Sequence, residues 1–378
     1  MPNATASPRA AYLHVPFCRH RCGYCDFAVV AGRDELIDRY LGALRREFER
    51  LPAALDLDTL YVGGGTPSHL GADGLRRLWE SFEGRLVPVE GAEVTIEANP
   101  ADVDRRLVAA AVACGVSRVS LGAQSLSVET LAALDRDHGP DDVRRAVDLL
   151  HGAGLAVNLD LMTAAPGQTL EDVERDLDAV LDLVPQHLSV YCLTWERGTR
   201  FIGLLNRGLL ERADEDLERR MFERAIDRLA AGGFEHYEVS NFALPGHRCR
   251  HNAGYWDCRP WEAFGPGAAR FDGRTRITNH RSPFTWMRRV EAGQDPAADH
   301  DRMTAEGAAR ERIVRTDFLA ASGFELDELL AGVLQVWVAN GWAADDGLRV
   351  GLTRAGLLIS DSLWEGVLGE GGRPGQNP

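Results

Sequence analysis

The sequence lacks the features that mark several large classes of protein. None of its 378 residues falls in an apolar run approaching the ~18 residues that a membrane-spanning helix requires. Positive charge is scarce, because 42 lysines and arginines face 57 aspartates and glutamates and leave a net charge of −15. Nucleic acid and anionic membranes are bound by basic surfaces, so we expect neither nucleic acid nor an integral membrane segment.

Secretory features and cysteines are also few. The first residues, MPNATASPRAAYLHVPFC, contain no long apolar stretch, so we expect no secretory signal. Seven cysteines are an odd and sparse set for a disulfide framework, and we therefore expect a reducing, cytoplasmic setting. Three of them, Cys18, Cys22 and Cys25, lie within eight residues, whereas the other four are scattered.

The cysteine triplet predicts a metal site. Structural zinc takes four protein ligands and an ordinary iron–sulfur cluster takes four cysteines, so three clustered thiolates are one short. A C-x3-C-x2-C run therefore indicates a [4Fe–4S] cluster with one open iron. That iron suits chelation by S-adenosylmethionine, which an electron from the cluster would cleave to a 5′-deoxyadenosyl radical. Zinc with a distant histidine, or three unrelated core cysteines, stays open as an alternative.

Strand-like and helix-like segments alternate over the first 240 residues. Apolar strands are predicted at residues 11–15, 59–62, 93–97, 118–121, 155–161 and 187–193. Helical segments separate them, and a long helix over residues 212–231 closes the last unit. This alternation predicts an α/β fold with a parallel sheet and crossover helices. Six units suit a partial (β/α)6 barrel better than a closed eightfold one.

Polar residues gather where these strands end. The run GGGT at residues 63–66 follows the second strand, and Glu97 ends the third. Gln124, Asp160 and Thr194 follow or lie late in the next three. Chemistry in parallel α/β folds lies at the carboxyl ends of strands, so these side chains and the cysteines should converge on one pocket. The glycines also suit a plain tight turn, and the two carboxylates suit salt-bridged strand ends.

The chain beyond residue 240 changes in character. We expect residues 1–240 to form the barrel domain and residues 241–298, rich in glycine, proline, arginine and aromatic residues, to form a connector. Residues 299–368 predict a small helical domain, in which 348–368 resemble the wing and last helix of a winged-helix unit. Residues 369–378 predict a disordered tail.

Several motifs together resemble the HemN/HemW branch of the radical S-adenosylmethionine family. The resemblance covers nearly the whole chain, to about residue 368, and implies that fold for the barrel. It implies that Cys18, Cys22 and Cys25 ligate the cluster. The motifs are YLHVPFC (12–18), the cysteine triplet followed by Asp-Phe, GGGTP (63–67), E-x-N-P (97–100), SLGAQS (120–125) and N-L-D-L (158–161).

The resemblance also implies where S-adenosylmethionine binds. Tyr12, Gly64 and Glu97 match family positions that contact the cluster-bound molecule. In coproporphyrinogen dehydrogenase a second S-adenosylmethionine is bound, and its surroundings are matched here by Gly65, Thr66, Gln124, Arg136, Asp160 and Thr194. For Arg136, within LDRDHG, a plain surface position is an equal alternative.

Two features separate the branches of this family. The oxygen-independent coproporphyrinogen dehydrogenase has a long segment before its cysteines and a further cysteine directly after the third. Here 17 residues precede Cys18, and Asp26 follows Cys25. Both features resemble the HemW-type haem chaperones rather than the dehydrogenase.

A third feature agrees with the chaperone branch. Residues 248–256, RCRHNAGYW, resemble the H-N-x-x-Y-W segment that is linked to haem binding in HemW proteins. Neutral imidazole is a good axial ligand of haem iron, so His251 is the candidate ligand. In the alternatives, His251 and Asn252 fix an irregular loop, or Cys249, Cys258 and His251 form a small zinc site. The aromatic side chains of Trp256, Trp261 and Phe264 suit flat apolar contact with a macrocycle. The guanidinium groups of Arg248, Arg250 and Arg259 suit pairing with the haem propionates.

Some positions depart from the family pattern. Residues 158–168 read NLDLMTAAPGQ where relatives have a Tyr-Gly or similar pair, so the pocket wall near Met162 and Thr163 is altered. The stretch between Glu311 and Phe324 looks shortened. Neither change touches the cysteines.

The leading hypothesis is a cytoplasmic haem chaperone with a [4Fe–4S] cluster and S-adenosylmethionine. It would pass haem to acceptor proteins such as respiratory haem enzymes and take electrons for its cluster from a donor. Whether it also runs a reaction stays open. The alternatives are oxidative decarboxylation of coproporphyrinogen III, a radical methyltransferase or cyclopropanase of the same branch, and DNA binding through the winged-helix-like end.

Overall fold

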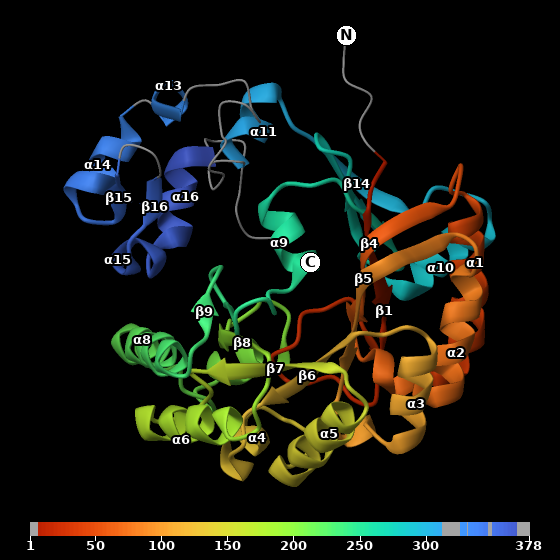
Figure 1. The fold of residues 1–378 in the computed structure, drawn as a ribbon, viewed down its shortest axis with the longest axis horizontal. Coiled ribbons are helices and arrows are strands. Elements are labelled where there is room, and N and C mark those ends of the chain that lie inside the picture. The colour runs from red at the N-terminus through yellow and green to blue at the C-terminus, as the bar shows by residue number, and fades with distance from the viewer. Residues whose placement is uncertain (1–6, 312–325, 331, 347–349, 369–378) are drawn as a thin grey trace.

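A single large sheet organises the fold. The computed structural model describes residues 7–311, 326–330, 332–346 and 350–368 (Figure 1). The sheet has nine strands in the order β11-β1-β4-β5-β6-β7-β8-β10-β9. Six neighbouring strands run parallel and in chain order, which confirms the predicted partial (β/α)6 barrel. They are β1 (Ala10–Val15), β4 (Leu55–Gly64), β5 (Leu86–Ala98), β6 (Arg118–Gln124), β7 (Ala156–Thr163) and β8 (His187–Cys192).

Crossover helices cover the outer face of the sheet, as Figure 1 shows. The long ones are α1 (Ile37–Glu49), α2 (Gly71–Phe82), α3 (Arg105–Ala113), α5 (Pro140–Gly152), α6 (Leu170–Leu181) and α8 (Glu215–Ala231). Shorter ones are α4 (Val128–Ala133), α7 (Arg200–Leu205), and the 3-10 turns η1 (Asp34–Leu36), η2 (Pro67–Leu70) and η3 (Pro100–Asp102). Side-chain caps begin several of them: Asp104, Thr169 and Asp214 each accept a backbone N–H of the first turn, typically worth about 1 kcal/mol.

Strand side chains alternate between the two faces of the sheet. Leu13, Val62 and Ile96 are buried under the helices, and each such side chain contributes about 1.5–3 kcal/mol to folding. Their neighbours Tyr12 and Tyr61 point to the other face, where their rings stack 6.1 Å apart. The barrel interior is therefore polar and aromatic, while the core lies between the sheet and the helices.

The predicted connector extends this sheet at both edges. β10 (Asn241–Ala243) pairs antiparallel with β8 and carries β9 (Glu235–His236), whereas β11 (Glu262–Phe264) pairs parallel with β1. Between them the chain forms α9 (Arg250–Trp256), which lies near the centre of Figure 1 and packs on β4. Whether residue 240 bounds a folding unit stays a prediction, although one sheet includes strands from both sides of it.

The remaining elements form smaller units. β12 (Ala269–Phe271), β13 (Thr275–Asn279) and β14 (Ala297–Arg302) make an antiparallel sheet beside α10 (Pro283–Glu291). Further on lie α11 (Ala305–Glu311), α13 (Leu326–Leu330), α14 (Val333–Ala339), β15 (Ala343–Asp345), β16 (Val350–Leu352), α15 (Arg354–Leu357) and α16 (Ser360–Leu368). The antiparallel pair β15–β16 followed by helices has the predicted wing-then-helix order. An ion pair of Arg354 with Asp227 ties this end to α8.

Two predictions fall outside the described residues: the tail 369–378 and most of the shortened stretch at 311–324. Within the part of the chain that the structure describes, every helix is too short or too polar to span a bilayer.

Candidate functional site

The three clustered cysteines lie in the loop that follows β1. Its ends are held side by side, because β2 (Phe17–Cys18) pairs parallel with β3 (Val30–Ala31). Within the loop the Cys25 N–H donates to the Cys22 carbonyl at 3.1 Å. Two loops contribute further contacts. The Thr66 hydroxyl, just after β4, donates to Cys18 Sγ at 3.5 Å, and Arg136 Nη1, between α4 and α5, donates to Cys22 Sγ at 3.4 Å. The fold therefore brings together the triplet, Thr66 and Arg136.

The chemistry of these thiols suits a multinuclear cluster. Burial raises the pKa of the Cys18 thiol to about 12 and also raises the pKa of Cys25, so both need a cationic metal to favour the thiolate. Among the described residues, no three His, Cys, Asp or Glu side chains lie close enough together to hold a single metal ion. Three thiols in one loop, two of which accept hydrogen bonds from Thr66 and Arg136, fit an iron–sulfur cluster with one open coordination position.

The glycine run ends β4 at the rim of the barrel. Gly64 has a φ of +109°, and a Cβ there would lie 2.4 Å from the His14 ring. A Cβ at Gly63 would lie 2.7 Å from the Glu97 carboxylate. Only glycine fits where the strand passes this close to its neighbours, so the run is more than a tight turn.

Glu97 is the central carboxylate of this rim. Its Oε2 accepts the Gly64 N–H at 2.8 Å, and its Oε1 accepts the Tyr61 hydroxyl at 2.9 Å. Burial, followed by the charge of Asp160, raises the pKa of Glu97 to about 7. Both carboxylates lie buried in the barrel interior, and the positive charge of Arg136 offsets the effect of burial on Asp160 only in part, so a cationic ligand would further stabilise their charged forms.

Asp160 has a separate set of partners. It accepts hydrogen bonds from the Ser120 hydroxyl at 3.0 Å and the Asn158 amide at 2.8 Å. Burial raises its pKa as well. Ser120 and Asn158 belong to the SLGAQS and N-L-D-L motifs, but their role as its donors was not predicted. Their position, on neighbouring strands and facing the same side as Asp160, is the signal that identifies them.

The other predicted residues lie around this rim. Gln124 has a positive φ of +63°, and Arg136 Nη2 donates to the Gly122 carbonyl at 2.9 Å. Tyr12 lies deeper in the barrel, where its hydroxyl is 3.1 Å from His14 Nδ1. Thr194 follows β8 with an exposed side chain. Of the predicted set, only His251 lies apart.

His251 lies in α9, toward the amino ends of the strands. It is 2% exposed, and its two ring nitrogens contact the Thr59 and Tyr255 hydroxyls at 2.9 and 2.8 Å. Burial lowers its pKa to about 3, so the imidazole is neutral. The expectation of an irregular loop is wrong, because residues 250–256 form a helix.

Glu93 fixes the start of this helix, a role that was not predicted. Its two carboxylate oxygens accept the backbone N–H groups of Arg250 at 3.1 Å and His251 at 3.0 Å. Cys249 Sγ also donates to Glu93, at 3.4 Å, whereas Cys258 Sγ donates to the Glu311 carbonyl. The thiols therefore do not converge on His251 as a zinc site requires. The available signal was spacing, since Glu93 lies four residues before Glu97 on the same strand face.

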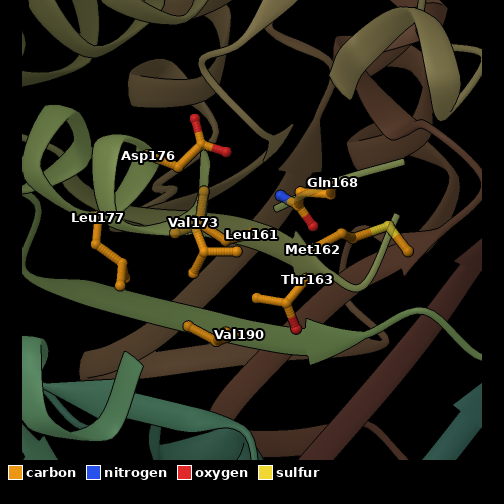
Figure 2. A pocket seen from close by; sticks show the side chains of 8 residues that line it. All are labelled: Leu161, Met162, Thr163, Gln168, Val173, Asp176, Leu177 and Val190. Carbon is orange, nitrogen blue, oxygen red and sulfur yellow. The ribbon is translucent and has the colours of Figure 1, made fainter. Parts of the chain in front are cut away.

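The altered residues at the end of β7 line a small cavity of about 10 Å³ outside the barrel (Figure 2). Its lining includes Met162 and Thr163 together with Leu161, Gln168, Val173, Asp176, Leu177 and Val190. Such a space holds about one water molecule. It is too small for a cofactor.

The fold and this rim define a radical S-adenosylmethionine protein, and residues 12–180 match the model of the Radical SAM superfamily. More specific relatives span almost the whole chain. The chain is 38% identical to "Heme chaperone HemW" of Mycobacterium tuberculosis, over 96% of this chain and 95% of that one. It is 35% identical to "Heme chaperone HemW" of Escherichia coli, over 96% and 99% of the two chains. The chain belongs to the HemW family.

A solved structure agrees with the fold. The chain matches the coproporphyrinogen III oxidase HemN from Escherichia coli, described as a radical SAM enzyme, with a TM-score of 0.85. The match covers 97% of this chain and 91% of that one at 19% identity. At this identity the likeness concerns the fold, including the C-terminal units, rather than the reaction.

Proposed function

We propose that this protein is a haem chaperone that binds haem and transfers it to acceptor haem proteins. The observation that carries the proposal is its 31–38% identity, over 95–100% of their lengths, to relatives named heme chaperone. The aspartate that follows Cys25 supports the same branch. We place this role in the cytoplasm, with acceptors such as respiratory haem enzymes.

Three residues would hold the cluster: Cys18, Cys22 and Cys25. Three thiolates leave one iron open to S-adenosylmethionine, and the bound cluster supplies single electrons that a partner protein must deliver. Hydrogen bonds to cluster sulfurs tune the reduction potential. Thr66 on Cys18 and Arg136 on Cys22 are placed for that role.

The rim of the barrel would hold S-adenosylmethionine. Its sulfonium and ammonium groups are cations, and a cation would favour the charged forms of Glu97 and Asp160, whose pKa values burial raises. Its carboxylate suits Arg136, whose Nε is buried without a partner among the described residues. Tyr12, Gly64 and Glu97 are proposed for the cluster-bound molecule; a second molecule would meet Gly65, Thr66, Gln124, Arg136, Asp160 and Thr194.

His251 is proposed as the haem ligand. Both of its ring nitrogens are engaged in this conformation, so ligation requires it to leave Thr59 or Tyr255. The exposed ring of Trp256 offers an apolar contact beside it. Arg248 and Arg259 are exposed but paired with Glu235 and Asp257, so a propionate would compete for them.

Haem titration of the anaerobically reconstituted protein tests this proposal. We expect a stable complex with an axially ligated iron spectrum, and at least about tenfold weaker binding for His251→Ala. His251→Asn keeps a polar group for Thr59, which separates ligation from the packing of α9. His300→Ala, at an exposed position on β14, is the matched control and should bind as the parent protein does. If both His251 variants bind haem as tightly as the parent protein does, His251 is not a haem ligand.

The second candidate is the decarboxylation of coproporphyrinogen III, the enzymatic alternative within the same branch of the family. We expect no protoporphyrinogen IX from the reconstituted protein in a product assay. Neither the methyltransferase nor the DNA-binding alternative gains support from the relatives.

A further inference from the structure

A chain of contacts crosses the barrel interior from α9 to the rim. The ring of His251 lies 5.3 Å from the ring of Tyr61, with 30° between the planes. The Tyr61 hydroxyl donates to Glu97, whose other oxygen holds the Gly64 N–H. Among the described residues, these contacts link the proposed haem ligand to the carboxylate proposed for S-adenosylmethionine through the side chain of Tyr61.

At the α9 end of this series of contacts, His251 is held by several neighbouring residues. Thr59 and Tyr61 lie two residues apart on the same face of β4, and both contact His251. Glu93 clamps the first turn of α9 and pairs with buried Arg118 at 3.4 Å. His251 therefore cannot shift alone: its displacement changes the contacts of β4 directly below the glycine run.

We propose that Tyr61 is a positioning residue for Glu97 that couples the two ends of the barrel, so that haem bound at α9 weakens S-adenosylmethionine binding at the rim. The inference rests on the proposed function and adds its regulation.

The sign follows from the geometry. Ligation of haem iron takes His251 away from Thr59 or Tyr255, and Tyr61 then loses the ring that packs against it. A less ordered Tyr61 holds Glu97 less well in the orientation that a cationic ligand needs. Linkage is reciprocal, so S-adenosylmethionine weakens haem binding by the same factor. In a chaperone, binding of S-adenosylmethionine would therefore promote the release of haem.

Calorimetric titration of S-adenosylmethionine into the reconstituted full chain, with and without saturating haem, measures the coupling. The cluster is kept oxidised so that the ligand is not cleaved. We expect haem to raise the dissociation constant by about fivefold or more, the low end of typical couplings. In Tyr61→Phe the ring remains but the hydroxyl that Glu97 accepts is gone, and the ratio should fall to about one while both ligands still bind.

Tyr40→Phe is the matched control. Tyr40 is a buried tyrosine of α1 whose hydroxyl donates to the His14 carbonyl, outside this chain of contacts, and its variant should keep the parent ratio. A purely structural role of Tyr61 would lower both affinities and leave the ratio unchanged. A parent ratio within twofold of one, tighter binding with haem, or an unchanged ratio in Tyr61→Phe overturns the inference alone. Absence of haem or S-adenosylmethionine binding overturns the proposed function and the inference together.

Discussion

At the scale of residues, the site is a set of buried ionisable groups, with the Arg136 guanidinium beside Cys22 and acting on Asp160. Cys18 and Cys25 are thiols with raised pKa values, and Glu97 and Asp160 are carboxyls with raised pKa values. Burial disfavours the charged form in each case. A cationic cluster beside the thiols and a cationic ligand beside the carboxyls would relieve both costs, which is why the two groups of residues make sense as one site.

Replacing one clustered cysteine should remove the metal. We expect Cys22→Ala to lose the four-iron cluster after anaerobic reconstitution, because two thiolates cannot hold it. Iron and sulfide content and the visible absorption spectrum measure this. Cys114→Ala changes a cysteine at the end of α3, far along the chain from the triplet, and should keep full iron content. A four-iron signal in Cys22→Ala would show that the ligands are assigned wrongly.

Glu97 should make stability depend on pH. Its carboxyl keeps a proton up to about pH 7 in the folded chain, whereas the ordinary pKa of an exposed glutamate is about 4.5. Between these values the folded state binds more protons than the unfolded state, so the free energy of unfolding falls as pH rises, by up to ~3 kcal/mol. Denaturant unfolding at pH 5 and pH 8, without cofactors, should show a smaller fall for Glu97→Gln. The exposed Glu90→Gln, on the same strand, serves as control. Equal slopes in all three proteins would contradict the burial argument.

At the scale of elements, the end of β4 depends on glycine. Gly64→Ala adds a Cβ at a φ of +109° and 2.4 Å from His14, so it should lower the melting temperature and weaken S-adenosylmethionine binding. Gly42→Ala lies in α1 with open space around it and should be neutral or stabilising by ~0.5–1 kcal/mol. Thermal unfolding of the two variants compares them directly. Equal stability would mean that β4 tolerates a side chain at its rim.

Helix α9 depends on Glu93. Glu93→Ala removes the acceptor for two backbone N–H groups and leaves buried Arg118 uncompensated, which costs about 3–5 kcal/mol. Denaturant unfolding should show this loss, and haem binding should weaken with it. Glu90→Ala, exposed on the same strand, should change neither measurement. If a folded Glu93→Ala protein binds haem as tightly as the parent protein does, haem does not bind at α9.

The sequence predicts correctly those elements whose hydrophobic pattern extends over enough residues to be recognised. The strands at 11–15 and 187–193 are apolar and bounded by turn residues, and both were placed within about one residue. β5 was predicted too short, because its first half contains Pro88, Glu90 and Gly91, which interrupt the alternation. α9 has seven residues, and β10 and β11 have three each. These lengths are too short for a helical or a strand period of hydrophobic residues to be recognised.

At the scale of the whole molecule, the site is assembled from residues that are distant in sequence. The motif resemblance predicted the triplet as cluster ligands and Thr66 and Arg136 as surroundings of a second S-adenosylmethionine. The structure places the side chains of Thr66 and Arg136 against cysteine sulfurs. It could not predict Tyr61 or Glu93, because neither belongs to a recognisable motif. Their roles arise only when the segment between β10 and β11 crosses from one edge of the sheet to the other and its helix α9 lies against β4.

This crossing gives the molecule two ends with different tasks. The cysteines and carboxylates lie at the carboxyl ends of the strands, whereas α9 lies toward their amino ends. One polar barrel interior joins them, which is the structural basis of the proposed coupling between a cofactor at one end and haem at the other.

The most direct test of the central claim is a haem transfer measurement. The reconstituted protein is loaded with haem and mixed with an apo-haem protein, and the acceptor's absorption spectrum is followed over time. We predict that haem moves to the acceptor, and that coproporphyrinogen III incubated with the same preparation yields no protoporphyrinogen IX. Failure to bind or pass on haem, together with decarboxylation of coproporphyrinogen III, would contradict the account and make this chain a porphyrin-pathway enzyme.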